Sequence, residues 1–325
     1  MLTAGPATLF RRDREVKLAL VLGAGGLVGI AHHVGVACAL LDELGFEESK
    51  ADLVVGTSAG SAVAAYLRSG WTPHELLARA TDLRDAAPGP LSGGTMQLVR
   101  HGIGSAYVVA RATVRVPSLL SLPSVPLLRR AFPAGIATMG NGPDILEREL
   151  PRSWPERRLW LATYDLVGRR RVVLGRPGEP YVPLPSAVRA SCAIPGLYPP
   201  VKIGRRIYVD GGAYSPTNLD LATKANCDFV ICISPMSHAP GPLVGPHWRL
   251  LRALPSLALR KEAEIARKAG VKVALVAPAV AELRAQGLNP MRATGLDAVV
   301  DAAYEATARM IDRGGLGPLL DEYAA

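Results

Sequence analysis

The segment Gly56-Thr57-Ser58-Ala59-Gly60 contains the serine of this sequence best suited to chemistry. It follows a short apolar run and precedes an alanine-rich stretch, which predicts a tight turn from a strand into a helix. Such a turn exposes the serine hydroxyl, and Gly56 and Gly60 leave room for the strand and helix packed beside it. The pattern indicates a nucleophilic serine. The alternative is a tight turn that the serine caps without any catalytic role.

A second glycine-rich turn, Gly23 to Gly29, also lies between an apolar run and a helical pattern. It is similar to a dinucleotide-binding loop, but Val28 stands where that pattern requires glycine. Such a turn can instead direct backbone N–H groups at an oxyanion. Loops that follow neighbouring parallel strands emerge at one edge of the sheet. We therefore expect the amides of Gly25 and Gly26 to lie near the Ser58 hydroxyl.

The best candidate to accept the serine proton is Asp210, at the end of the strand-like stretch 205–209. Gly211 and Gly212 follow it and predict another sharp turn. An isolated Asp-Gly pair is usually a turn without chemistry. Three glycine-bounded polar turns in one α/β chain favour a catalytic pair of Ser58 and Asp210.

The elements around these turns predict an α/β fold. Two successive strand–helix units indicate a mainly parallel sheet with right-handed crossovers. Apolar runs typical of strands cover residues 17–22, 52–55, 158–163, 171–174, 229–234 and 271–276, and helical patterns cover 30–44, 59–67, 250–269 and 295–312.

The 325 residues, 49% of them hydrophobic, suit one large domain. We expect a motif-bearing core over about 16–222 and a C-terminal helix–strand–helix extension over 223–325. Between the motifs, residues 86–143 are rich in glycine and proline, which indicates an insertion. It is interpreted equally well as a lid that faces a membrane or as a pair of buried helices.

Composition limits the partners. The formal charge of +9 favours anionic surfaces, but the arginines are scattered, so no nucleic acid is expected. The four cysteines lack metal-ligand spacing, and we expect no metal and no cofactor. Neither a secretory signal nor a membrane-spanning helix is predicted, so the expected location is cytoplasmic, with peripheral membrane association left open.

The three turns, in this order, resemble the patatin-like phospholipase family. The segments 190–196 and Tyr198-Pro199-Pro200 are similar to the stretch that precedes the family's Asp-Gly-Gly motif. The resemblance covers about 17–221. It implies a three-layer α/β/α fold and a lipid acyl hydrolase, in which Ser58 is the nucleophile, Asp210 the base, and Gly25 and Gly26 the oxyanion donors.

One departure from the family concerns position 28, where many members have a basic residue proposed to hold phosphate. Because Val28 carries no charge, the resemblance gives less support to a phospholipid substrate and favours a neutral glyceride or a simple ester. Two other interpretations stay open. A Ser-His-Asp triad would use His238 or His247, and a lipid-binding protein would have lost turnover. His32 and His33 are interpreted as structural or pocket-lining.

Overall fold

The computed structural model describes residues 17–80, 137–239 and 246–316. Along the chain the strands are β1 (Leu18–Leu22), β2 (Leu53–Thr57), β3 (Arg158–Asp165), β4 (Arg170–Leu174), β5 (Val201–Ile203), β6 (Arg206–Asp210), β7 (Phe229–Ile233) and β8 (Lys272–Val276). The α-helices are α1 (Gly26–Leu44), α2 (Ala59–Arg68), α3 (Pro73–Ala80), α6 (Gly142–Glu149), α7 (Leu184–Ser191), α8 (Asp220–Lys224), α9 (Pro246–Lys268), α10 (Val280–Gln286) and α11 (Leu296–Asp312). Within these described ranges the 3₁₀ helices are η1 (Glu48–Lys50) and η4 (Gly211–Ala213).

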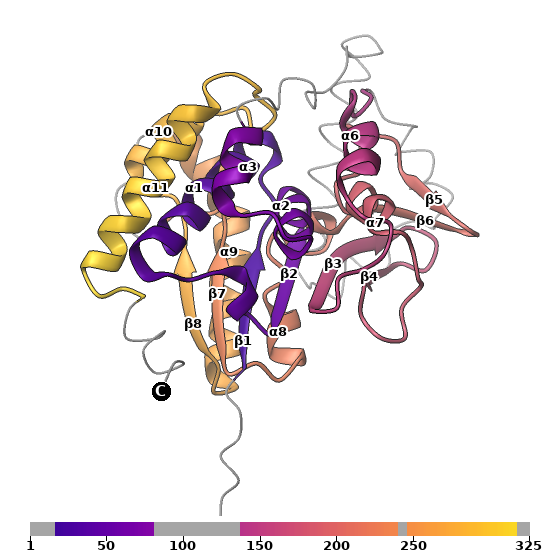
Figure 1. Ribbon diagram of the computed structural model, residues 1–325, viewed down its shortest axis with the longest axis horizontal. Coiled ribbons are helices and arrows are strands. Elements are labelled where there is room, and N and C mark those ends of the chain that lie inside the picture. Colours follow the sequence, from indigo (N-terminus) through magenta and orange to yellow (C-terminus); the bar gives the residue numbers. More distant parts are fainter. Residues whose placement is uncertain (1–16, 81–136, 240–245, 317–325) are drawn as a thin grey trace, which may run out of the picture.

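The eight described strands form one sheet, in the order β5-β6-β3-β2-β1-β7-β8, with β4 paired to β3 as a side branch (Figure 1). The pairs β1–β2, β1–β7, β2–β3 and β7–β8 are parallel, as the sequence predicts. The remaining pairs, β3–β4, β3–β6 and β5–β6, are antiparallel. The fold is therefore α/β with a mainly parallel central sheet.

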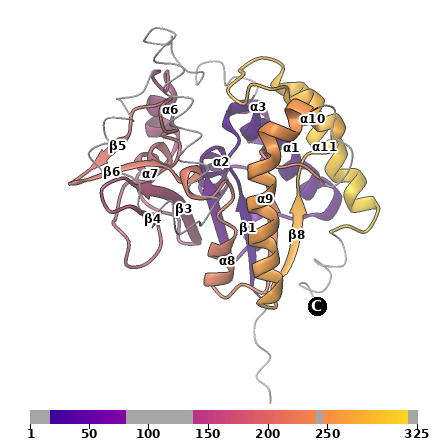
Figure 2. The same cartoon turned by 180° about the vertical axis from the view of Figure 1, so that it is seen from behind.

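Helices cover both faces of this sheet. Leu18, Leu20 and Leu22 of β1 pack with residues of α1, α2 and α7, whereas Ala19 and Val21 pack with residues of α8 and α9. This alternation follows from the strand period of two, which sends successive side chains to opposite faces. Figure 1 shows α1, α2 and α7 on the near face, and Figure 2 shows α8 and α9 on the other.

Strand β6 brings the aspartate to the site from an unexpected direction. It runs antiparallel to β3, with Asp210 opposite Thr163, and β3 runs parallel to β2, with Ala162 opposite Thr57. Asp210 therefore ends at the level of Ser58, although β6 enters the sheet edge from the opposite direction to β1 and β2. Asp210 therefore lies at the expected edge of the sheet, but on a strand that runs in the opposite direction to β1 and β2.

The C-terminal third is joined to the same sheet. Strand β7 pairs with β1, and α11 packs along α1 through Leu296, Val299 and Val300. Helix α1 is long and apolar enough to span a membrane by length and composition alone, but two thirds of that stretch is buried in the fold. Its apolar character is accounted for by neighbours on several sides.

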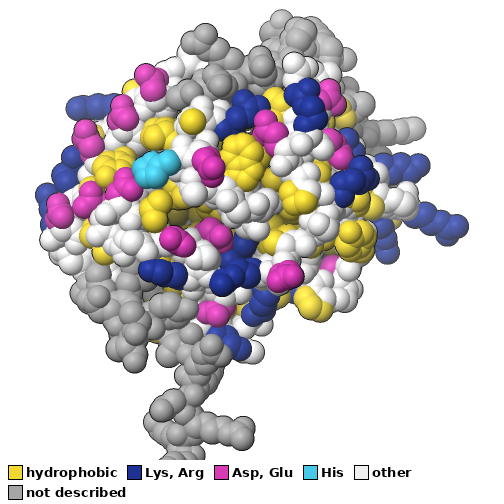
Figure 3. All heavy atoms as spheres, viewed as in Figure 1, with side chains coloured by type: hydrophobic (Ala, Val, Ile, Leu, Met, Phe, Trp, Pro, Cys, Tyr) yellow, Lys and Arg dark blue, Asp and Glu magenta, His cyan; other side chains and the backbone are white. Residues whose placement is uncertain are grey.

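Most of the expected insertion, residues 86–136, lies outside the described part of the chain, so its interpretation as a lid or a helix pair stays a prediction. On the face seen in Figure 3, positive and negative side chains are interspersed, with apolar side chains exposed between them.

Candidate active site

The backbone at Ser58 has the strained geometry of a strand-to-helix elbow. Ser58 is the N-cap of α2 and has φ 54° and ψ −122°, which is rare for a residue with a side chain. A Cβ at Gly56 would lie 2.6 Å from the Cα of Ser61, and one at Gly60 would collide with the carbonyl of Leu22. The two glycines are therefore required by packing, as the sequence predicts.

Ser58 and Asp210 meet in a buried position. The Ser58 side chain lies within hydrogen-bonding reach of the Asp210 carboxylate, and the amide of Gly212 donates to Oδ1 of the same group at 2.7 Å. Each of the two residues is only 4% exposed. Burial raises the pKa of Asp210 to about 6, while the hydrogen bonds from Ser58 and Gly212 oppose that shift. A carboxylate with this pKa is ionised near neutral pH and still a useful proton acceptor.

The glycine loop after β1 adjoins the serine turn. The amide of Gly60 donates to the carbonyl of Gly23 at 3.2 Å, which ties the two loops together. Gly26, the first residue of α1, has φ +63° and lies beside Ser58 in the wall of one cavity. Among the described residues, the amides of Gly25 and Gly26 have no hydrogen-bond acceptor. These two N–H groups at a helix N-terminus are available for an anion.

The valine at position 28 faces away from this site. Its side chain is 4% exposed and packs with Ala31 and with Leu296 and Val299 of α11. A lysine or arginine there would have to bury its charge against the apolar face of α11, at high cost. The departure from the family pattern therefore has a packing reason.

His32 and His33 lie within α1 and are fully buried, in agreement with the structural alternative. Nε2 of His33 is 2.7 Å from the carbonyl oxygen of Gly23, so a proton on Nε2 lets the ring donate to the glycine loop. Burial lowers the pKa of His33 to about 4, which keeps the ring neutral. His33 thus helps to fix the loop that carries Gly25 and Gly26.

Two further residues hold the serine turn and were not singled out from the sequence. The Ser191 hydroxyl accepts a hydrogen bond from the Ser58 amide at 3.1 Å and donates to the Ala162 carbonyl at 2.8 Å. The Cys192 thiol donates to the Ser58 carbonyl at 3.3 Å. Both belong to the segment 190–196 that resembles the family, which was the available signal.

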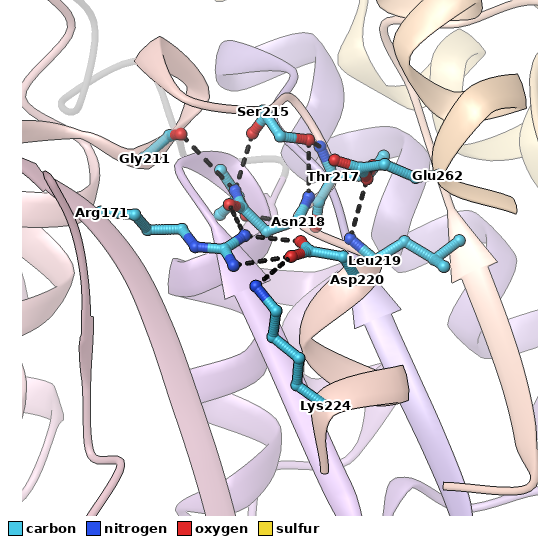
Figure 4. Close-up of polar contacts among 10 residues, drawn as sticks. Arg171, Gly211, Ser215, Thr217, Asn218, Leu219, Asp220, Lys224 and Glu262 are labelled. Atoms are coloured by element: carbon cyan, nitrogen blue, oxygen red, sulfur yellow. Dashed lines mark hydrogen bonds and ion pairs between the residues drawn. The ribbon is translucent and has the colours of Figure 1, made fainter. Parts of the chain in front are cut away.

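Beneath the two turns lies a polar network centred on Asn218 (Figure 4). This residue is fully buried and has φ 55°. Its Nδ2 donates to Thr57 Oγ1 at 3.0 Å, to the Ser215 carbonyl at 2.7 Å and, at 3.5 Å, to the Gly211 carbonyl. Asn218 therefore links the residue before Ser58 to the residue after Asp210.

Charged side chains surround Asn218. Arg171 donates to Asn218 Oδ1 at 2.9 Å and to both carboxylate oxygens of Asp220. Glu262 of α9 accepts from the Thr217 hydroxyl at 2.7 Å and from the Leu219 amide at 3.0 Å (Figure 4). Each named polar group has a partner, so the network fixes the loop from Gly211 to Asp220 from several directions.

On the other side, Ser58 lies in the wall of an apolar cavity. It encloses about 990 Å³, including solvent at its mouth. Its walls come from α1, α2, α3, α6 and α7, together with Met291, and are almost entirely apolar. Its apolar lining suits an aliphatic ligand.

His238, one of the two histidines proposed for the alternative triad, is not found at Asp210. Nδ1 of His238 is 2.8 Å from the Ala239 carbonyl, and His238 is not among the described contacts of Asp210. The side chain of His247 lies outside the described residues. Within the described ranges, no group of His, Cys, Asp and Glu side chains could hold a metal ion.

The fold and the strand-to-helix turn at Ser58 define an α/β protein with a Gly-x-Ser-x-Gly elbow. The family model for patatin-like phospholipase matches residues 20–223, more than half of the chain. The protein belongs to this family, and membership implies lipid acyl hydrolase activity. No curated protein matches the sequence significantly.

Solved structures with a similar chain path include VipD from Legionella pneumophila, with 14% identity and a TM-score of 0.40 over 92% of this chain and 67% of VipD. The type III effector ExoU has 17% identity and a TM-score of 0.38, over 93% of this chain and 54% of its own. ExoU in complex with SpcU, from Pseudomonas aeruginosa, has 16% identity and a TM-score of 0.36, over 92% and 52%. The chain thus spans about two thirds of VipD and about half of ExoU.

Proposed function

We propose that the protein hydrolyses a carboxylic ester of a lipid through an acyl-enzyme, with Ser58 and Asp210 as a catalytic dyad. The observation that carries the proposal is the closeness of the Ser58 side chain to the buried Asp210 carboxylate, together with the place of Ser58 in the wall of an apolar cavity. A carboxylate in this position can accept the serine proton as the oxygen attacks.

In the first half of the reaction, Ser58 Oγ bonds to the ester carbonyl carbon and its proton passes to Asp210. The amides of Gly25 and Gly26 donate to the oxyanion that forms. The bond to the leaving alcohol then breaks, and Asp210 returns the proton to that alcohol. In the second half, a water molecule loses a proton to Asp210, attacks the acyl carbon and releases the carboxylic acid, while Ser58 regains its proton.

The packing of Val28 against α11 supports a neutral glyceride or a simple ester over a phospholipid, because position 28 offers no charge to a phosphate. The formal charge of +9 supports peripheral contact with an anionic membrane that holds the substrate.

The test combines labelling with turnover. A fluorophosphonate probe should label the protein, and the protein should hydrolyse members of a panel of p-nitrophenyl esters, glycerides and phospholipids. Ser58→Ala should abolish labelling and hydrolysis, and Asp210→Asn should reduce both by about 10³-fold or more. Ser69→Ala, at the other end of α2, is the matched control and should retain activity.

Three results would overturn the proposal. Unchanged hydrolysis in Ser58→Ala would remove the nucleophile, and an unlabelled, inactive but lipid-binding wild type would favour the non-enzymatic interpretation. Loss of activity in His238→Ala or His247→Ala, with Asp210 intact, would instead favour the triad.

A further inference from the structure

The cavity that Ser58 lines is also lined, about two helical turns further along α2, by Tyr66, which forms a polar cluster with Glu149 and Arg79. The Tyr66 hydroxyl donates to Glu149 at 2.6 Å, and Nε of Arg79 donates to the same carboxylate at 3.0 Å. These residues come from α2, α6 and α3, which join here away from the catalytic turns. Tyr66 and Arg79 line the cavity itself.

Between Ser58 and this cluster the cavity wall is apolar. On α2 the lining positions are Ala59, Ala62, Val63 and Tyr66, a spacing that places them on one face of the helix. The other walls contribute Leu27, Ile30, Val34, Leu76, Ile145 and Leu146. An aliphatic chain attached at Ser58 would contact hydrocarbon along its whole course.

The length of α2 gives the length of this course. A helix rises about 1.5 Å per residue, so Ser58 and Tyr66 are about 12 Å apart along the axis. An extended alkyl chain built from C–C bonds of about 1.5 Å near the tetrahedral angle advances about 1.25 Å per carbon. The apolar course therefore holds about nine or ten carbons.

The far end does not extend the apolar wall. Glu149 is engaged by both Tyr66 and Arg79, and the Arg79 and Glu149 side chains are about one quarter exposed, at 25% and 24%. A longer chain would have to displace these charged groups from water and from each other, which is unfavourable.

We propose that this cavity is the acyl-binding site for medium-chain esters, and that the Tyr66–Glu149–Arg79 cluster sets the upper limit of chain length. The inference rests on the proposed function and adds the substrate class. The ester carbonyl lies at Ser58, the chain follows the face of α2, and the terminal methyl group stops before the cluster.

The first experiment measures kcat/KM of the full chain on p-nitrophenyl esters from two to sixteen carbons below their aggregation limits. We expect kcat/KM to rise by about twofold to fourfold per methylene up to eight to ten carbons and to fall beyond that length. A flat profile, or a steady rise to sixteen carbons, would overturn the proposal.

Two variants locate the site. Ala62→Leu narrows the course one turn after Ser58 and should lower hydrolysis of the octanoyl ester by at least tenfold while the acetyl ester is retained. Arg79→Met should move the optimum towards longer chains by about two carbons or more, because the charge is removed. Arg152→Met is the matched control. Arg152 pairs with Glu147, which lies on α6 like Glu149, but the Arg152 side chain is 72% exposed. The chain-length profile of this variant should not change.

A binding measurement separates this inference from the catalytic proposal. In Ser58→Ala, which should not turn over ester, calorimetry should show tightest binding of free carboxylic acids of eight to ten carbons, and Arg79→Met in that background should shift the preference upwards. If wild type is inactive but binding follows this order, the dyad fails and the acyl site stands. If Ser58→Ala abolishes activity but neither binding nor turnover depends on chain length, the acyl site fails alone.

Discussion

The two sides of Ser58 differ in chemistry. On one side lies the Asn218 network, in which Arg171, Asp220 and Glu262 engage backbone and side-chain groups of the loop after Asp210. On the other side lies the cavity, where apolar side chains of five helices make dispersion contacts without directional bonds. Directional bonds fix atoms to within tenths of an ångström, whereas an apolar wall accepts chains of several shapes.

This contrast divides the tasks of the site. The polar side holds the Ser58 and Asp210 turns at a constant separation, which proton transfer requires. The apolar side selects the acyl group through buried area. Substitutions on the polar side should therefore lower kcat on every ester, and substitutions in the cavity should change KM for long chains only.

Among the variants that compare the two sides, the largest effect is expected for Asn218→Asp, which replaces the amide donor by a carboxylate. Loss of its hydrogen bonds to Thr57 and to the Ser215 and Gly211 carbonyls should let the two turns shift, and kcat should fall by about 100-fold on acetyl and octanoyl esters alike. Steady-state kinetics and the rate of fluorophosphonate labelling measure this, well below the unfolding temperature.

Asn226→Asp is the control for this variant, because Asn226 has a similar φ of 57° but is exposed. It should keep wild-type kinetics. An Asn218→Asp protein with unchanged kcat, or with a loss confined to long chains, would break the division between the two sides.

The next effect concerns pH. Because burial raises the pKa of Asp210 to about 6, the carboxylate is ionised above that pH and protonated below it. Only the ionised form accepts the serine proton, so kcat/KM should be level near pH 8 and should fall about tenfold by pH 5. A pH profile of octanoyl ester hydrolysis measures the midpoint.

Arg79→Met should leave that midpoint unchanged, since the cavity cluster contributes nothing to the described contacts of Asp210. A shift of the midpoint by a full pH unit in this variant would show that the two sides are coupled.

The smallest effect is expected for Met291→Ala, which removes one side chain from the cavity wall. KM for the octanoyl ester should rise about threefold to tenfold, with kcat and the acetyl ester little changed. Met310→Ala, on α11 and outside the cavity lining, serves as the control. A loss of kcat in Met291→Ala would mean that this residue acts on the turns as well as on the chain.

The same contrast explains what the sequence could predict. Turns are local, so the glycines around Ser58 and Asp210 could be recognised from their own segments, as could the strand–helix order around them. Asn218 and Thr57 are 161 positions apart, and Ser191 and the Ser58 amide are 133 apart. Contacts at such separations depend on the completed sheet, and no local pattern encodes them.

Strand sense was hidden for a similar reason. A strand-like run such as 205–209 predicts a strand but does not state its direction, and the antiparallel sense of β6 appears only in its pairing with β3. The role of Val28 was equally invisible, since its partners on α11 lie about 270 residues later in the chain.

The segment before α11 has a consequence for how this protein can diverge from its relatives. A Cβ at Gly26 would meet the Pro290 carbonyl at 2.5 Å, and the Val28 amide donates to the same oxygen at 3.1 Å. The family match ends at residue 223, so the glycine loop is buttressed by a part of the chain beyond that match. Changes in this last third could retune the choice of ester in a descendant enzyme while every shared motif stays intact.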